Sequence, residues 1–221
     1  IYNFTLGLQQ EIGFQTIMEV SYVGSFARHL GERVNINGVP DGARLATNNI
    51  DPVTGQRLGN DFLRPYRGYA DINLVRWAGT SNYNSLQVQV TRRYTQGFQY
   101  GLAYTYSKSF DYANDDSSEV AFARPYKDFN YAPSDFDQTH ILTINYIYDV
   151  PSLSRKFNNG FVKAIFDHWE LSGTTSYASG KTKNITVTYN GGVTDITGGQ
   201  DNARANTICG PMRNISGADP A

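Results

Sequence analysis

Six segments of the chain alternate apolar residues with small or polar ones. In one of them, Phe98, Tyr100 and Leu102 occupy every second position, with Gln99 and Gly101 between them. Successive side chains of a β-strand point to opposite faces, so this period of two predicts strands with one apolar face and one polar face. The predicted strands cover residues 1–12, 15–28, 83–94, 98–111, 139–150 and 168–180.

The connections between the predicted strands alternate in length. Strands one and two meet around Gly13–Phe14, and strands three and four around Gln96–Gly97, where the spacing suits hairpin turns. The connection from Pro151 to His168 is intermediate. The long connections cover residues 31–82, 112–138 and 181–221. The long loops therefore gather at one end of the sheet, whereas hairpins of compact soluble domains have loops of about 2–5 residues.

Short turns at one end and long loops at the other are typical of outer-membrane barrels, whose turns are periplasmic and whose loops are extracellular. The sequence therefore predicts an all-β fold in which antiparallel up-and-down strands form part of a transmembrane β-barrel in the cell outer membrane. The residues expected to face lipid are Tyr100, Leu102, Tyr104, Tyr106, Leu142, Ile144 and Tyr146. The residues expected to face the lumen are Gln87, Gln89, Thr91, Arg93, Gln99 and Thr105.

The composition agrees with a membrane-facing wall. The 221 residues include 16 Tyr and 12 Phe, and barrel strands carry aromatic girdles where they cross the membrane interfaces. No apolar run approaches the roughly 20 residues that a spanning helix needs. The formal net charge of -1 and the scattered basic residues argue against a nucleic-acid partner.

Residues suited to covalent or metal chemistry are sparse. Cys209 is the single cysteine, so the chain alone cannot build a disulfide framework or a cysteine-based zinc site. A loop thiol and a pairing with a cysteine elsewhere in a longer chain both fit Cys209. The chain has no G-x-S-x-G motif, and its three histidines fall near predicted strand ends. We therefore predict no enzymatic activity and no cofactor.

The loop 112–138 carries the candidate ligand-binding residues. They are acidic residues followed by a basic and an aromatic residue, namely Asp115, Asp116, Glu119, Arg124 and Tyr126. Carboxylates are ligands for calcium, but their spacing here matches no EF-hand loop. We expect a solvated loop that contacts the ligand and holds no metal ion.

A second group, Asp135, Asp137 and His140, has the composition of a metal triad. On an extended chain, residues 135 and 137 share one face while residue 140 points to the other. One strand cannot gather all three side chains, so no metal site is predicted there either.

Three stretches resemble a known family: "SNYNSLQVQVTRRYTQGFQYGLAYTYSKSFD", "DFDQTHILTINYIYDVP" and "HWELSGTTSYASG". They resemble the C-terminal barrel of TonB-dependent outer-membrane receptors, notably the Oar-like group that carries an N-terminal carboxypeptidase-regulatory-like domain. The segment "VSYVGSFARHL" resembles a strand end common in that group. The resemblance covers most of residues 1–180.

This resemblance implies a barrel of about 22 strands with an internal plug. Residues 1–221 are then expected to be a partial barrel domain of a longer chain, which takes up a solute with energy from the TonB complex. The implied partners are outer-membrane lipid, the plug domain of the same full-length chain, the TonB complex through regions outside this sequence, and an imported solute whose identity stays open.

Two other functions fit the same pattern. A soluble β-sandwich or jelly-roll module could use surface tyrosines and tryptophans to stack on glycans. A passive porin or adhesin barrel would share the wall and lack the plug. Solubility without detergent would distinguish the soluble module from a receptor. A plug domain encoded in the full-length chain would distinguish a receptor from the passive barrel.

Overall fold

A computed structural model describes residues 1–113, 119–121, 130–151, 169–183 and 197–200. These residues form two compact units. The sheet unit contains the described residues within 1–33, 75–120 and 127–182, and the loop unit contains those within 34–74, 121–126 and 183–221.

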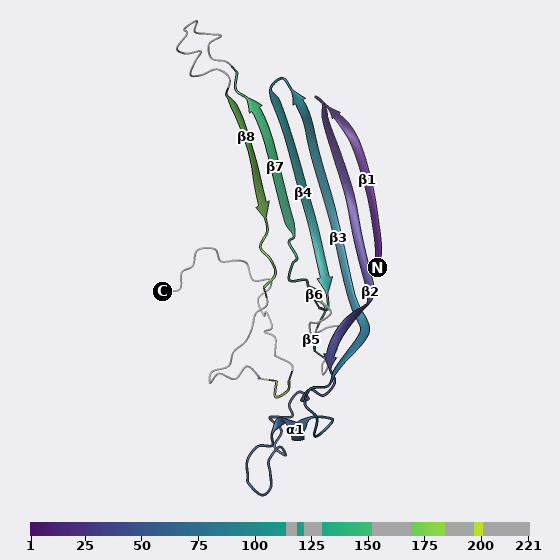
Figure 1. The fold of residues 1–221 in the computed structure, drawn as a ribbon, viewed down its shortest axis with the longest axis vertical. Coiled ribbons are helices and arrows are strands. Elements are labelled where there is room, and N and C mark those ends of the chain that lie inside the picture. The colour runs from purple at the N-terminus through teal and green to yellow at the C-terminus, as the bar shows by residue number, and fades with distance from the viewer. Residues whose placement is uncertain (114–118, 122–129, 152–168, 184–196, 201–221) are drawn as a thin grey trace, which may run out of the picture. The chain divides into compact units, whose positions relative to one another are not determined.

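The sheet unit is built from antiparallel strands (Figure 1). Its strand order is β1-β2-β3-β4-β7-β8, with short β5 paired to β2 and short β6 paired to β4. The bounds are β1 Tyr2–Gly13, β2 Thr16–Asn35, β3 Asn73–Thr95, β4 Phe98–Asp111, β5 Glu119–Val120, β6 Ala132–Pro133, β7 His140–Asp149 and β8 Glu170–Ala178. Within the described part of the chain, β1 and β8 form the two edges of an open sheet. The predicted all-β, up-and-down fold is confirmed.

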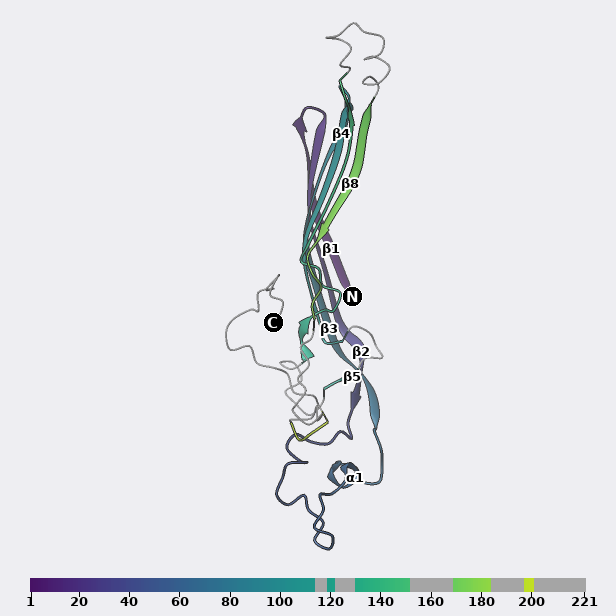
Figure 2. The same cartoon turned by 90° about the vertical axis from the view of Figure 1, so that its left-hand side faces the viewer.

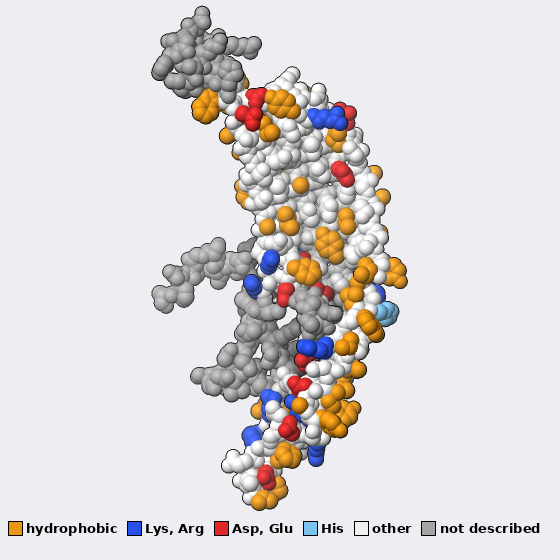
Figure 3. Space-filling view, in the orientation of Figure 1, with side chains coloured by type: hydrophobic (Ala, Val, Ile, Leu, Met, Phe, Trp, Pro, Cys, Tyr) orange, Lys and Arg blue, Asp and Glu red, His pale blue; other side chains and the backbone are white. Residues whose placement is uncertain are grey.

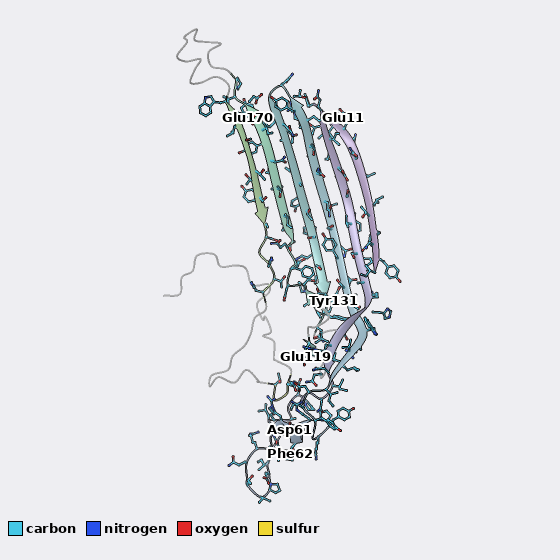
Figure 4. All side chains as sticks on the ribbon, viewed as in Figure 1. Glu11, Asp61, Phe62, Glu119, Tyr131 and Glu170 are labelled. Carbon is cyan, nitrogen blue, oxygen red and sulfur yellow. The ribbon has the colours of Figure 1, made fainter. Side chains whose placement is uncertain are left out.

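Two tight turns connect strands at one end of the sheet. Phe14 and Gln15 have φ values of 50° and 56°, and Gln96 and Gly97 have 53° and 76°. Two-residue hairpin loops with positive φ at both positions are the type I′ geometry that matches the twist of the flanking strands. Glu11 and Glu170 lie at this end of the sheet, while Tyr131 and Glu119 lie toward the other (Figure 4).

The register gives the sheet two chemically different faces. Gln87 pairs with Thr105, and Val88 pairs with Tyr104, which in turn pairs with Leu142. Residues directly opposite each other in an antiparallel pair share a face. The alternation seen along each strand therefore continues across β3, β4 and β7, with amides and hydroxyls on one face and aliphatic and aromatic side chains on the other.

On the apolar face, aromatic residues lie at both ends of the strands and aliphatic residues lie between them. Along β4, Phe98 and Tyr100 lie at the turn end, Leu102 in the middle, and Tyr104 and Tyr106 toward the loop end. Their β7 partners follow the same order, in the list Tyr148, Tyr146, Ile144, Leu142 and His140. Outer-membrane strands have this layout, an apolar band of about 25 Å between two aromatic girdles.

The apolar face is not covered by a second layer of the described chain. The strands overlap as one layer when the molecule is turned by 90° (Figure 2). The face seen in Figure 3 is mainly white, and hydrophobic side chains are more frequent along its right-hand rim. Leu6 and Leu8 are 71% and 76% exposed. Among the described residues, the buried apolar side chains are Ala27, Val34, Val39 and Val120. No helix of this described part is both long and apolar enough to span a membrane.

The predicted loop 31–82 is too long, because β2 and β3 extend into it. β2 continues to Asn35 and β3 begins at Asn73, so residues 36–72 make the connection. The charged residues of this extension concealed its strand pattern, although Glu32 Oε1 and Arg76 Nε form a 2.6 Å ion pair across it. The predicted loop 112–138 likewise contains the short strands β5 and β6.

The connection 36–72 is folded and belongs to the loop unit. It contains the short helix α1, Asn60–Leu63, and an antiparallel bridge between Ile50 and Arg57. Asp51 caps the turn within that bridge, because its carboxylate accepts hydrogen bonds from Val53 N at 2.9 Å and Thr54 Oγ1 at 2.8 Å. These hydrogen bonds hold the pKa of the Asp51 carboxyl below its ordinary value.

Candidate functional site

The polar face contains a shallow hollow between β2, β3 and β4. Its polar lining residues are Glu19, Ser21, Gln87, Gln89 and Thr105. Three of the residues predicted to face the lumen, Gln87, Gln89 and Thr105, therefore lie together. Ser21 Oγ donates to Glu19 Oε1 at 3.2 Å, which holds the carboxylate against β2.

The hollow suits neutral polar groups. Glu19 is the one acidic residue that lines the hollow, and no Lys, Arg or His lines it. The other polar side chains of the lining are amides and hydroxyls. Amides both donate and accept hydrogen bonds, and so do hydroxyls. A surface of this kind can bind peptide groups or hydroxyl-rich solutes through exchangeable hydrogen bonds.

The remaining residues predicted to face the lumen share the same face outside the hollow. Thr91 pairs with Gly101, and Gln99 pairs with Ile147. Arg93 follows Thr91 by two positions in β3, so the alternation of the strand puts it on that face as well. Among the residues predicted to face lipid, Tyr100 pairs with Tyr146, Leu102 with Ile144 and Tyr104 with Leu142. Tyr106 pairs with Leu86 and His140, and Tyr100 also pairs with Arg92.

A buried polar network joins β4 to the connection between β6 and β7, and no sequence pattern predicted it. Ser134 Oγ donates to Asp111 Oδ2 at 2.6 Å, and Ser109 N donates to Asp137 Oδ1 at 2.8 Å. The other Asp137 oxygen binds Lys108 Nζ at 3.1 Å. These residues lie far apart along the chain and have ordinary loop character, so only strand pairing brings them together.

Asp137 and His140, two members of the group considered above as a metal triad, lie in different surroundings. Asp137 is committed to Lys108 and Ser109, whereas His140 pairs with Tyr106 on the apolar face. The hydroxyl of Tyr104 lies 2.8 Å from His140 Nδ1. Asp137 and His140 thus bind different partners.

One asparagine organises the loop unit. Asn37 is completely buried, and its Nδ2 donates to the carbonyl oxygens of Tyr66, Tyr69 and Ala70 at 2.8–3.0 Å. Its Oδ1 accepts a hydrogen bond from Tyr66 N at 2.8 Å. The stretch of chain from Tyr66 to Ala70 therefore wraps around a single side chain, while the Tyr66 and Tyr69 rings remain 53% and 67% exposed.

An ion pair joins the two ends of the stretch that surrounds Asn37. Arg64 Nη1 lies 2.6 Å from Asp71 Oδ1 and also donates to the Asn37 carbonyl oxygen at 3.1 Å. The hydrogen bond from the Arg64 guanidinium holds the pKa of the Asp71 carboxyl below its ordinary value. Gln200 Nε2 also reaches Asp71 Oδ1, at 3.4 Å.

Residues 197–200 dock onto the start of the same loop, although they belong to the last predicted loop. Gly42 N donates to Thr197 O at 2.7 Å, and Gln200 N donates to Val39 O at 2.9 Å. The approach is close because Gly199 has no side chain, and a Cβ there would lie 2.9 Å from the Asp41 Cα. Nothing in the sequence of either segment alone indicates the contact.

The predicted ligand-binding residues are largely outside the described part of the chain. Asp115, Asp116, Arg124 and Tyr126 all lie outside it. Glu119 lies in β5, where its side chain is exposed and its neighbour Val120 is buried. The ligand-binding role of these five residues stays a prediction, and Cys209 also lies outside the described residues.

Comparison with known proteins gives one family and one structure. A family model described as an outer membrane beta barrel domain matches residues 1–220. The crystal structure of the outer membrane transporter YddB from Escherichia coli aligns with 66% of this chain at 13% identity and a TM-score of 0.41. The aligned region spans 18% of that transporter's chain. A search of curated proteins found no match.

Proposed function

We propose that this chain, which belongs to the outer membrane beta barrel domain family, forms part of the barrel wall of a TonB-dependent receptor of the Oar-like group. The family places the chain in the outer membrane, so the soluble β-sandwich interpretation is wrong. In the proposed receptor, the apolar face contacts lipid and the polar face lines the path of an imported solute.

The observation that carries the proposal is the contrast between the two faces of one layer. The hollow around Gln87, Gln89 and Thr105 offers mainly neutral hydrogen-bonding groups, and the opposite face carries mainly aliphatic and aromatic side chains. A plug domain or a passing solute needs a surface with which it can form hydrogen bonds and then exchange them. Contact with lipid needs an apolar surface, which the opposite face of the sheet provides.

The loop unit supports a receptor with a shaped capture surface. Residues 36–72 are held by Asn37, by the pair of Arg64 and Asp71, and by the docked segment 197–200. Loops positioned by a rigid scaffold commonly carry binding residues. We propose that this loop and the loop 112–138 together select the solute, with Glu119 among the contacting residues.

Crosslinking in the full-length protein tests whether a plug lies against the polar face. A photoreactive amino acid placed at Gln87 or Gln89 should crosslink to a segment of the same chain outside residues 1–221. Placed at Tyr100 on the apolar face, it should give no such product. Absence of an intramolecular product from both polar positions would contradict the plug.

Conductance separates the receptor from a passive porin. A plugged receptor in a planar bilayer should show no large open channel, whereas a porin should conduct steadily. Uptake that persists without TonB would also exclude the energised mechanism. Steady conductance or TonB-independent uptake would contradict the receptor function, but neither would contradict a barrel wall in the outer membrane.

A further inference from the structure

The loop end of β1 and β2 carries a cluster of aromatic rings on the apolar face. The Phe4 ring centroid lies 5.7 Å from that of Tyr22 and 5.4 Å from that of Phe26. Tyr2 pairs with Phe26 and is 69% exposed. Aromatic belts of this kind mark the level at which a strand passes from hydrocarbon to headgroups.

Arg28 follows directly beyond this cluster. It lies two residues after Phe26 in β2, so the strand alternation directs it to the same apolar face. Its guanidinium carbon lies 5.7 Å from the Phe26 ring centroid, and the residue is exposed. A long basic side chain placed there can cover apolar surface with its stem and extend its charge to the headgroup level.

The charge of Arg28 is not neutralised within the described part of the chain. Its Nη1 donates to the carbonyl oxygens of Ala27 at 2.8 Å and Ser81 at 3.2 Å, and no described carboxylate forms an ion pair with it. A guanidinium has five N–H donors in a planar fork that matches phosphate. The two carbonyls engage one nitrogen, which leaves donors for an anion.

His29 adds a second basic side chain through a strained backbone. It has a φ of 55° in the middle of β2, and its side chain is exposed. The left-handed conformation costs roughly 1–2 kcal/mol for a residue with a Cβ. A strained, exposed histidine beside an unneutralised arginine indicates a binding role.

We infer that Arg28 and His29 form a contact site for the phosphate groups of membrane-lipid headgroups at the loop end of the barrel wall. The occupant follows from position and charge, because Arg28 continues the apolar surface outward from its aromatic residues and His29 is the next, exposed residue. A basic residue near an anionic membrane surface contributes about 1 kcal/mol. The inference rests on the outer-membrane location and does not depend on the proposed import function.

Two lipids that differ only in a phosphate test the site. The full-length protein in detergent is titrated by native mass spectrometry with phosphatidate and with diacylglycerol of the same acyl chains. Arg28→Gln should weaken phosphatidate binding about fivefold and leave diacylglycerol binding unchanged. Arg28→Lys, which keeps the charge, should retain most of the affinity and shows that the position tolerates substitution.

The matched control is Arg67→Gln, which removes one exposed arginine from the loop unit. It should leave phosphatidate binding unchanged. Equal loss in Arg67→Gln and Arg28→Gln would overturn the site in favour of general charge attraction. Unchanged phosphatidate binding in Arg28→Gln, or an equal loss of diacylglycerol, would overturn it as well.

His29→Gly separates binding from folding. Glycine adopts positive φ without the Cβ penalty, so this variant should resist heat at least as well as the parent protein. It should nevertheless bind phosphatidate more weakly, because the imidazole is gone. Unchanged phosphatidate binding in a stable His29→Gly protein would overturn the assignment of His29 to the site.

Discussion

The sheet unit and the loop unit are stabilised in different ways. In the sheet unit, ladders of backbone hydrogen bonds fix the register, and large apolar side chains such as Leu6 and Leu8 remain exposed. In the loop unit, one buried side chain, Asn37, satisfies four backbone groups. The stability of the sheet therefore depends on many equivalent backbone hydrogen bonds, whereas that of the loop unit depends strongly on the hydrogen bonds of Asn37.

This difference has a consequence for function. A wall made of repeated backbone hydrogen bonds tolerates change on its polar face, so the side chains of that face can vary without loss of the fold. A loop in which one asparagine binds four backbone groups keeps its exposed tyrosines in a fixed backbone frame, but a single substitution can release it. The following changes test that contrast in the full-length protein.

Asn37→Ala should have the largest effect. It leaves three carbonyl oxygens and one N–H without their partner in a buried site, which we expect to cost about 3–5 kcal/mol of loop stability. Protease should then cut within residues 36–72 much faster, while the heat-modifiable migration of the barrel stays unchanged. Loss of barrel migration would show that the two units are not independently stabilised.

Leu102→Lys should destabilise the sheet by about 2–4 kcal/mol, because it buries a charge in the lipid-facing band. The measurement is the urea dependence of folding into lipid vesicles. Ala103→Lys is the matched control, since Ala103 is the next residue and lines the hollow on the polar face. Similar losses in both variants would refute the assignment of the two faces.

Gly199→Ala should weaken the docking of residues 197–200 by about 1–3 kcal/mol, as overpacked sites do. The new Cβ would lie 2.9 Å from the Asp41 Cα and N, so the backbone must shift. Gly180→Ala is the control, because a Cβ there meets nothing within 4 Å. The readout is hydrogen exchange at Gly42 N and Gln200 N, and equal exchange in both variants would contradict the docking.

The smallest effect is a pH dependence of the loop unit. The pKa of Asp71 is lowered in the folded state, so the Arg64–Asp71 pair contributes stability above the unfolded pKa and loses it as pH falls through the folded pKa. The Asp71 side chain is 49% exposed, which limits the contribution to less than about 1 kcal/mol. Asp71→Asn should reduce the acid-induced increase in protease cutting of residues 36–72, and an unchanged increase would contradict this origin.

The alternation of residue types was sufficient to predict the strands, their two faces and both tight turns. Gln87, Gln89 and Thr105 could be grouped in advance because the period of a strand is local, and each side chain's face follows from its position. The ends of β2 and β3 were not predicted, because Glu32 and Arg76 break the apolar pattern while they stabilise each other across the strands.

The sequence alone therefore predicts local features: strands with one apolar and one polar face, and tight turns at one end of the sheet. Which distant residues meet depends on the folded chain. Asn37 lies beside a glycine in a segment that looks like an ordinary turn, and its role exists only because Tyr66 to Ala70 fold back around it. Residues 197–200 reach Val39 through a backbone approach that side-chain patterns do not encode.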